Sequence, residues 1–157
     1  MAYFPVTSAD VDELRAFLRE ADLTLAGLDS PAVRIWIERG ANSGIVGSTG
    51  FELSADGSHA LIRSVAVSGS MRAAGTGTRL ARYALEEAAR AGAERAWLFS
   101  RRSGPFWQKL GFTPADRDML ASVLPETQQV RLFTSTGQLE REVAWSRDLS
   151  GLSRTQQ

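Results

Sequence analysis

An arginine and two closely spaced glycines lead into a long amphipathic segment in the middle of the sequence. The stretch SVAVSGSMRAAGTGTRLARYALEEAARAG, residues 64–92, ends an apolar run at Val67 and then passes through Arg72, Gly75 and Gly77. A helix start presents unpaired N–H groups and the positive end of a dipole, which favour a phosphate group. Glycine lets a ligand approach the backbone closely. The stretch therefore predicts a phosphate-binding turn, and a tight turn whose glycines serve only packing is the alternative.

The pattern differs from two common nucleotide-binding motifs. Leu80 stands where G-x-G-x-x-G needs its third glycine, and no Gly-Lys-Ser/Thr follows as in a Walker A loop. An [RQ]-x-x-G-x-G match alone arises by chance in roughly one chain in ten of this length. The turn therefore needs support from a second motif.

Length and composition exclude several classes of protein. The chain has 157 residues, 43% of them hydrophobic, which fits one globular domain with a sizeable core. Lys+Arg and Asp+Glu balance at 18 each, so no net charge favours nucleic acid or an anionic membrane surface. There is no cysteine and only one histidine, so we expect no disulfide, cysteine nucleophile or metal site. With no signal-like N-terminus and no apolar run of membrane-spanning length, we expect a cytoplasmic protein.

Hydrophobic periodicity predicts an α+β order with a mixed sheet. The expected strands are residues 3–6, 32–39, 44–54, 60–68, 94–100, 127–135 and 140–149, the last two as an antiparallel pair. The expected helices are residues 8–21, 75–91, 105–110 and 117–124. We expect a single domain over residues 1–149 and a loose tail over residues 150–157. Trp36 and Trp145 are interpreted as core or sheet-face residues, and Arg101 and Arg102 as a solvated loop pair.

The second motif is PFWQKLGF, residues 105–112, which follows a predicted strand about 30 residues after the turn. Together the two motifs resemble the acetyl-CoA signature of the GNAT superfamily of N-acetyltransferases, and the resemblance covers nearly the whole chain in element order. It implies a mostly antiparallel central sheet flanked by helices and splayed at the strand that ends near Val67. It also implies that acetyl-CoA is the acetyl donor, with pantetheine beside that strand and pyrophosphate at residues 72–78.

The resemblance carries over residue by residue. The implied cofactor-binding residues are Val65, Val67, Arg72, Ala73, Ala74, Gly75, Thr76, Gly77, Thr78 and Phe106. The backbone N–H of Val67 is the expected donor to the oxyanion. Many members place a proton-donating tyrosine where this chain has Trp107, which puts acid catalysis in doubt without forbidding turnover, because a thiol with a pKa of about 8.5 is a tolerable leaving group. Tyr83 is the alternative phenol, but its spacing with Leu80 favours packing.

A finer resemblance points to one kind of substrate. The segments EADLTLAGLD, GSTGFEL, ALIRSVAV, FWQKLGF and QQVRLF fall at intervals similar to those of the arsenic-resistance N-acetyltransferase subgroup. Related GNAT proteins acetylate the amino group of phosphinic or arsinic glutamate analogues. The resemblance thus implies a small, anionic, amino acid-like acceptor, such as glutamate, phosphinothricin or arsinothricin.

Three charged residues are candidates for the acceptor side of the site. Glu52 could accept the proton of the amine, directly or through water, or could be a surface residue near a turn. Arg63 shares strand parity with Val65 and Val67, so it could clamp an acidic group of the substrate, or else pair with a protein carboxylate. Arg131 is a second clamp candidate, with a solvent-facing strand position as its alternative.

Three functions remain open from the sequence. The first is an enzyme that acetylates a small amine. The second is a regulatory module that binds acyl-CoA without turnover, which the missing tyrosine favours slightly. The third is an enzyme that acetylates a protein or peptide amine. A homodimer is an open option for any of them.

Overall fold

The computed structural model describes residues 2–155, without the side chains of residues 72–74 and 153–155. Its strands are β1 (Phe4–Pro5), β2 (Val33–Arg39), β3 (Ile45–Leu53), β4 (His59–Val67), β5 (Arg95–Phe99), β6 (Thr113–Ala115) and β7 (Ala144–Asp148). Its α-helices are α1 (Val11–Glu20), α2 (Thr76–Arg90), α3 (Gly104–Lys109), α4 (Arg117–Val123), α5 (Gln128–Thr136) and α6 (Ser150–Thr155). Short 3-10 segments are η1 (Ser8–Asp10), η2 (Gly69–Ala74) and η3 (Gln138–Arg141).

The strands form one sheet in the order β1-β2-β3-β4-β5-β7-β6. Neighbouring strands run antiparallel except β4 and β5, which are parallel and are connected through α2. The predicted α+β class with a mixed, mostly antiparallel sheet is therefore confirmed. Among residues 2–155, no helix is long and apolar enough to cross a membrane.

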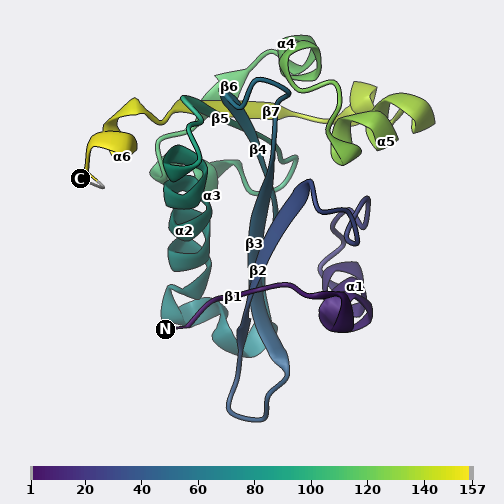
Figure 1. Ribbon diagram of the computed structural model, residues 1–157, viewed down its shortest axis with the longest axis vertical. Coiled ribbons are helices and arrows are strands. Elements are labelled where there is room, and N and C mark those ends of the chain that lie inside the picture. Colours follow the sequence, from purple (N-terminus) through teal and green to yellow (C-terminus); the bar gives the residue numbers. More distant parts are fainter. Residues whose placement is uncertain (1, 156–157) are drawn as a thin grey trace.

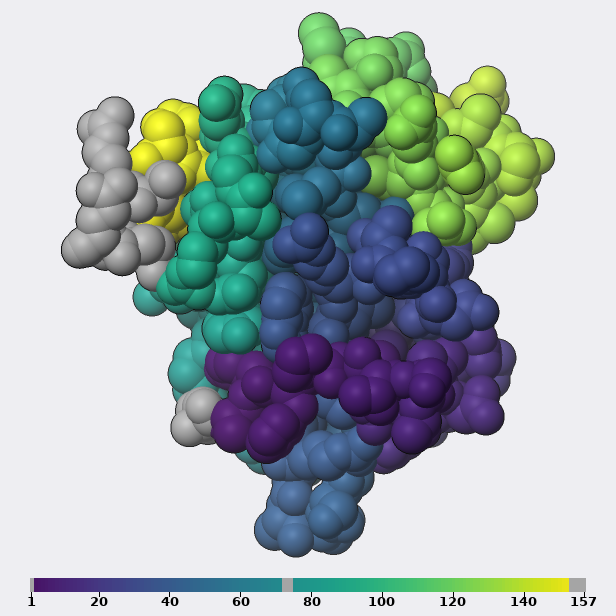
Figure 2. Space-filling view, in the orientation of Figure 1, coloured from purple at the N-terminus to yellow at the C-terminus, as the bar shows by residue number. Residues whose placement is uncertain are grey.

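Helices cover both faces of the sheet, and they divide one face into two halves (Figure 1). On one face α2 packs its alanines and leucines against Phe51, Ile62 and Leu98. On the other face Leu14 and Leu18 of α1 pack against β2 and β3, whereas α4 and α5 cover the part of the sheet near β5 and β7. In Figure 2 the green α4–α5 region lies at the upper right, and the purple N-terminal segment lies below it. The space between these two halves is where the site lies.

One predicted element near the C-terminal end is wrong. Residues 127–135, expected as a strand, form helix α5, whose N-cap Thr127 accepts a hydrogen bond from the backbone of Val130 and whose C-cap Gly137 has a φ of +77°. Val130 and Phe133 are both buried at helical spacing. The strand β7 therefore pairs with β5 and β6 instead.

Within the segment expected to be a loose tail, residues 150–155 form helix α6. This helix begins where the Asp148 carboxylate accepts hydrogen bonds from the N–H and hydroxyl of Ser150. Leu152 packs against the core beside α2. Burial of an apolar side chain thus fixes a segment whose composition alone looks featureless.

Candidate active site

The pairing of β4 with both of its neighbours changes along its length. Against β3, the register shifts between Ser48 and Gly50, so β4 carries one extra residue there. Ser64 has a φ of +62° at this point, and its carbonyl accepts a 2.6 Å hydrogen bond from the hydroxyl of Ser48. Against β5, β4 pairs only over its first three residues, His59–Leu61. The two parallel strands therefore separate towards Val67, as the resemblance predicted.

The turn between β4 and α2 has the backbone that its glycines allow. Gly75 caps α2 with a φ of +74°, a left-handed conformation that side chains rarely adopt. A Cβ on Gly77 would lie 3.4 Å from Val67 and 3.7 Å from the ring of Phe106, so it would narrow the space beside that wall. This cradle of small groups fits the passage of a pantetheine chain towards a phosphate at the helix start.

The remaining residues of the predicted cofactor loop differ in how far the structure describes them. Thr76 is fully buried and accepts a 3.1 Å hydrogen bond from Arg79, which orders the first turn of α2, and Thr78 is half-buried in the same turn. The side chains of Arg72, Ala73 and Ala74 lie outside the described residues. Their contacts with a cofactor stay predictions.

A cleft of about 1000 Å³ opens where β4 and β5 separate. Four residues predicted to contact the cofactor, namely Val65, Val67, Gly77 and Phe106, lie in its wall. The opposite side is formed by residues 21–26, which follow α1, and by α5 with the segment after it. One cleft therefore joins the cofactor strand to a chamber large enough for an acceptor molecule.

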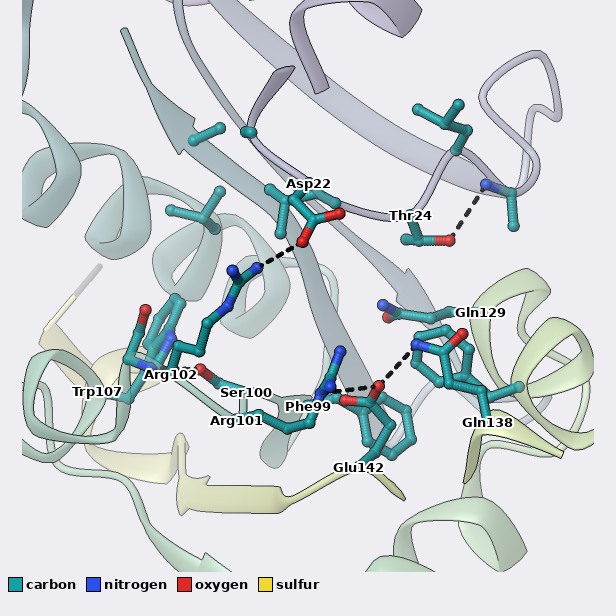
Figure 3. A pocket seen from close by; sticks show the side chains of 18 of the residues that line it. Asp22, Thr24, Phe99, Ser100, Arg101, Arg102, Trp107, Gln129, Gln138 and Glu142 are labelled. Atoms are coloured by element: carbon teal, nitrogen blue, oxygen red, sulfur yellow. Dashed lines mark hydrogen bonds and ion pairs between the residues drawn. The ribbon is translucent and has the colours of Figure 1, made fainter. Parts of the chain in front are cut away.

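Charged side chains line the acceptor side of this cleft (Figure 3). Glu142 is 8% exposed, and one of its carboxylate oxygens, Oε2, accepts a 2.8 Å hydrogen bond from Gln138 and lies 3.4 Å from Nε of Arg101. At the rim, Arg102 pairs with Asp22 at 3.0 Å, and both side chains are largely exposed. Arg101 and Arg102 therefore lie in the cleft wall, whereas the sequence indicated only a solvated loop pair.

Glu52 and Arg63 form a buried ion pair with each other. Nη1 of Arg63 donates to Oε2 of Glu52 at 2.9 Å, and the two side chains are 0% and 3% exposed. The carboxylate also accepts hydrogen bonds from the backbone N–H groups of Gln128 (2.6 Å) and Gln129 (3.3 Å), at the start of α5. Burial lowers the pKa of Arg63, and the charge of Glu52 opposes that shift. The pair thus fastens the acceptor-side helix α5 to the sheet.

This geometry does not fit the roles predicted for the pair, because neither Glu52 nor Arg63 is among the residues that line the cleft. The carboxylate expected as a base already accepts three hydrogen bonds. The parity argument for Arg63 fails at the bulge, since the extra residue at Ser64 turns Val65 towards the α2 face while Arg63 meets Glu52 and α5 on the other. The alternative left open by the sequence, a permanent protein carboxylate beside Arg63, is the observed one.

The other predicted residues also have clear positions. Arg131 is exposed on α5 and is not among the cleft-lining residues, because a helix rather than a strand carries it. Trp107 lines the cleft and packs between Phe106 and Phe112, with ring centroids 4.9 and 5.4 Å away. Tyr83 stacks in an aromatic group with Tyr3 and Trp36 away from the cleft-lining residues, as its spacing indicated.

Sequence reasoning missed Glu142, Gln138 and Gln129. Glu142 stands in EREVAWSRDL, where alternation indicated an ordinary strand, and Gln129 stands in the segment misread as a strand. One signal for α5 was present, because a threonine before a segment with apolar residues three apart is typical of a capped helix. No local signal marks Glu142, which the fold places beside the distant Arg101.

The comparisons with known proteins agree with this geometry. Residues 3–112 match the family model described as Acetyltransferase (GNAT) family. No curated protein gives a significant match. Among solved structures, the chain is similar to an acetyltransferase of the GNAT family from Staphylococcus aureus Mu50, with 14% identity, a TM-score of 0.73, and coverage of 95% of this chain and 99% of that one.

Two further similar structures contain coenzyme A. A Mycobacterium tuberculosis protein in complex with CoA has 15% identity and a TM-score of 0.73, with coverage of 94% of this chain and 99% of that one. N-acetylglutamate synthase from Neisseria gonorrhoeae, complexed with coenzyme A and N-acetyl-glutamate, has 19% identity and a TM-score of 0.73. The alignment covers 94% of this chain and 35% of the synthase, so the chain spans about a third of that relative.

The family match extends from the N-terminal strand to the end of the motif after β5 and includes both the bulged strand and the glycine turn. The cleft beside that strand is lined by Val65, Val67, Gly77 and Phe106, which the resemblance assigns to the cofactor. The chain belongs to the acetyltransferase (GNAT) family.

Proposed function

We propose that this protein transfers acetyl from acetyl-CoA to the amino group of a small, amino acid-like molecule that carries an acidic group. One observation carries the proposal: the cleft joins the cofactor strand to a chamber in which a buried carboxylate, Glu142, and a half-exposed guanidinium, Arg101, lie 3.4 Å apart. A zwitterion presents the two opposite charges that match this pair.

The charges of the cleft favour a zwitterion over a polycation. Two acidic side chains, Asp22 and Glu142, face two basic ones, Arg101 and Arg102, so the lining carries no net charge. A polyamine or an aminoglycoside would bring several positive charges to a lining that has two carboxylates and two guanidinium groups. An acidic amino acid can place its carboxylate against a guanidinium in the bidentate geometry that arginine favours.

The donor side is assigned to the residues around the bulge. Acetyl-CoA supplies an activated acetyl group when bound. The backbone of Val65 and Val67 and the turn from Arg72 to Thr78 are the groups that we assign to holding it, and the N–H of Val67 is the proposed oxyanion donor. The indole N–H of Trp107 is too weak an acid to protonate a thiolate, so we assign Trp107 to shaping the cleft wall.

The proposed substrates are the acidic amino acids and analogues that the sequence resemblance implied. Glutamate, phosphinothricin and arsinothricin each combine one amine with acidic groups, and they stay within this proposal. We assign the clamp for their acidic group to Arg101, with Arg102 at the rim, because these two arginines line the cleft and Arg63 does not.

A thiol-release assay with acetyl-CoA tests the proposal. The panel contains the common amino acids, phosphinothricin, arsinothricin, spermidine, kanamycin and a lysine peptide. We expect acidic amino acids or their analogues to be the best acceptors, and Arg101→Ala to raise their KM at least tenfold. Arg131→Ala, an exposed arginine on α5, is the matched control and should leave KM unchanged. A panel in which spermidine, kanamycin or the peptide reacts while amino acids are inert would contradict the proposal.

A further inference from the structure

The carboxylate of Glu142 has one occupied and one open oxygen. Both of its contacts, with Gln138 at 2.8 Å and with Arg101 at 3.4 Å, are made by Oε2. Oε1 accepts no hydrogen bond from any residue that the structure describes. Because Gln138 and Arg101 approach the same oxygen, they fix the orientation of the carboxylate and leave the other oxygen for a donor from the cleft (Figure 3).

A second group in the same cleft also lacks a partner. Gln129 is only 9% exposed, and its Oε1 is buried without any hydrogen-bond partner among the described residues. The side chain lines the cleft, and its amide end is directed into it (Figure 3). A buried carbonyl oxygen without a donor is unfavourable, and a ligand in the cleft can supply the missing donor.

The backbone of Gln129 is hydrogen-bonded to the buried ion pair of Glu52 and Arg63. Its backbone N–H donates to Glu52 at 3.3 Å, and the same oxygen of Glu52 accepts from Arg63 at 2.9 Å. The buried ion pair therefore anchors the first turn of α5 and sets where the Gln129 side chain enters the cleft. This is a positioning role for Glu52 and Arg63, exercised through the helix.

We infer that Glu142 and Gln129 form an ammonium-binding subsite, which rests on the proposed function because it would seat the amine that is acetylated. A primary ammonium has three N–H donors and no acceptor, and the subsite offers it two acceptors, Oε1 of Glu142 and Oε1 of Gln129. Charge-assisted hydrogen bonds to a carboxylate are stronger than neutral ones, so Glu142 supplies most of the affinity. The ligand class is a primary alkylammonium whose carbon chain lies in the apolar part of the cleft.

The apolar part lies beside these two acceptors. Leu132 and Phe133 follow Gln129 on α5, and Leu25 faces them from the segment after α1. The subsite therefore discriminates between an alkylammonium and an alcohol of the same shape by charge alone. That difference allows a test with simple probes and without acetyl transfer.

NMR titration of the whole protein tests the inference. The reporter is the side-chain amide signal of Gln129, assigned by its loss in Gln129→Met, and the probes are n-butylammonium chloride and n-butanol. We expect n-butylammonium to shift the reporter in a saturable way and n-butanol not to do so. Glu142→Gln, which keeps the shape of the side chain, should weaken the binding at least tenfold. Glu140→Gln, an exposed glutamate two residues away, is the matched control and should bind as the parent does.

Three results overturn the inference: no saturable shift in the parent, an equal shift by n-butanol, or unchanged affinity in a folded Glu142→Gln variant. If Glu142→Gln does not fold, Gln129→Met is titrated instead, with the backbone amide of Glu142 as reporter, and unchanged affinity again contradicts the subsite. The proposed function fails separately. If the protein binds n-butylammonium saturably but acetylates no amino acid, the ammonium subsite is supported and the proposed substrate class is refuted.

Discussion

Replacing Arg63 by methionine should strongly destabilise the protein. The change removes the guanidinium and leaves the carboxylate of Glu52, which is 2% exposed, with only the two backbone N–H groups at the start of α5. Removing one partner of a buried ion pair costs about 3–5 kcal/mol, because the other charge stays buried without compensation. For a chain of this size, that loss corresponds to a fall in Tm of about 6–20 °C.

Urea denaturation of four variants measures this effect. The double variant Glu52→Gln/Arg63→Met removes both charges and keeps an acceptor oxygen for the N–H groups of α5, so it should be more stable than Arg63→Met alone. Arg102→Met breaks an ion pair whose side chains are 69% and 80% exposed, and as the matched control it should change stability by less than about 1 kcal/mol. The fourth variant, Glu52→Gln, completes the double-mutant cycle.

Two outcomes refute this reasoning. The first is a loss below about 1 kcal/mol for Arg63→Met, which would show that water or a rearrangement compensates the carboxylate. The second is strict additivity of the two single losses, which would show that the charges do not interact. A rise in the KM of the amine alone, with unchanged stability, would return Arg63 to the role of substrate clamp.

The remaining predictions concern the cofactor wall, the missing tyrosine and one turn. Gly77→Asp should lower CoA affinity at least a hundredfold by calorimetry, because its carboxylate enters the cradle, whereas Gly69→Ala, which meets only open space, should not. Trp107→Phe should lower kcat less than tenfold; a loss above about a hundredfold would mean that the ring positions the thioester. Hydrogen bonds, first of all from the backbone N–H of Ser58, lower the pKa of Asp56 from 3.8 to about 2. Asp56→Asn should therefore be less stable than the parent at pH 7, and chemical denaturation should show the difference shrinking as the pH falls from about 4 through 2.

The sequence by itself determined the elements whose signals are local. The glycine turn and the 3.6-residue spacing that follows it predicted α2, and the structure confirms the helix. Pro105 after a buried strand predicted the start of α3. Apolar runs bounded by turn residues predicted β2, β3, β4 and β5. These signals depend on steric and hydrogen-bonding preferences of a few consecutive residues, so they survive without knowledge of the fold.

Helix α5 shows where local signals become ambiguous. The segment Gln128–Thr136 is short and rich in polar residues. Its apolar residues fit both the alternation of a strand and the three- to four-residue spacing of one helix face. The contacts that decide are distant: the N–H groups of Gln128 and Gln129 donate to Glu52, which is 76 and 77 residues away. The position predicted for Arg131 depended on strand parity, so it failed together with the predicted strand.

The acceptor site was decided by tertiary structure alone. One extra residue at Ser64 reverses the alternation of β4, which moves Arg63 from the cofactor side to a buried pair with Glu52. Glu142 becomes a candidate ligand only because the fold places it beside Arg101, which lies 41 positions earlier. A bulge reverses which face of the sheet each later side chain of the strand points to. The contact between Glu142 and Arg101 forms only because the fold brings two distant segments together. Neither the residue types nor their spacing along the chain encode those facts locally.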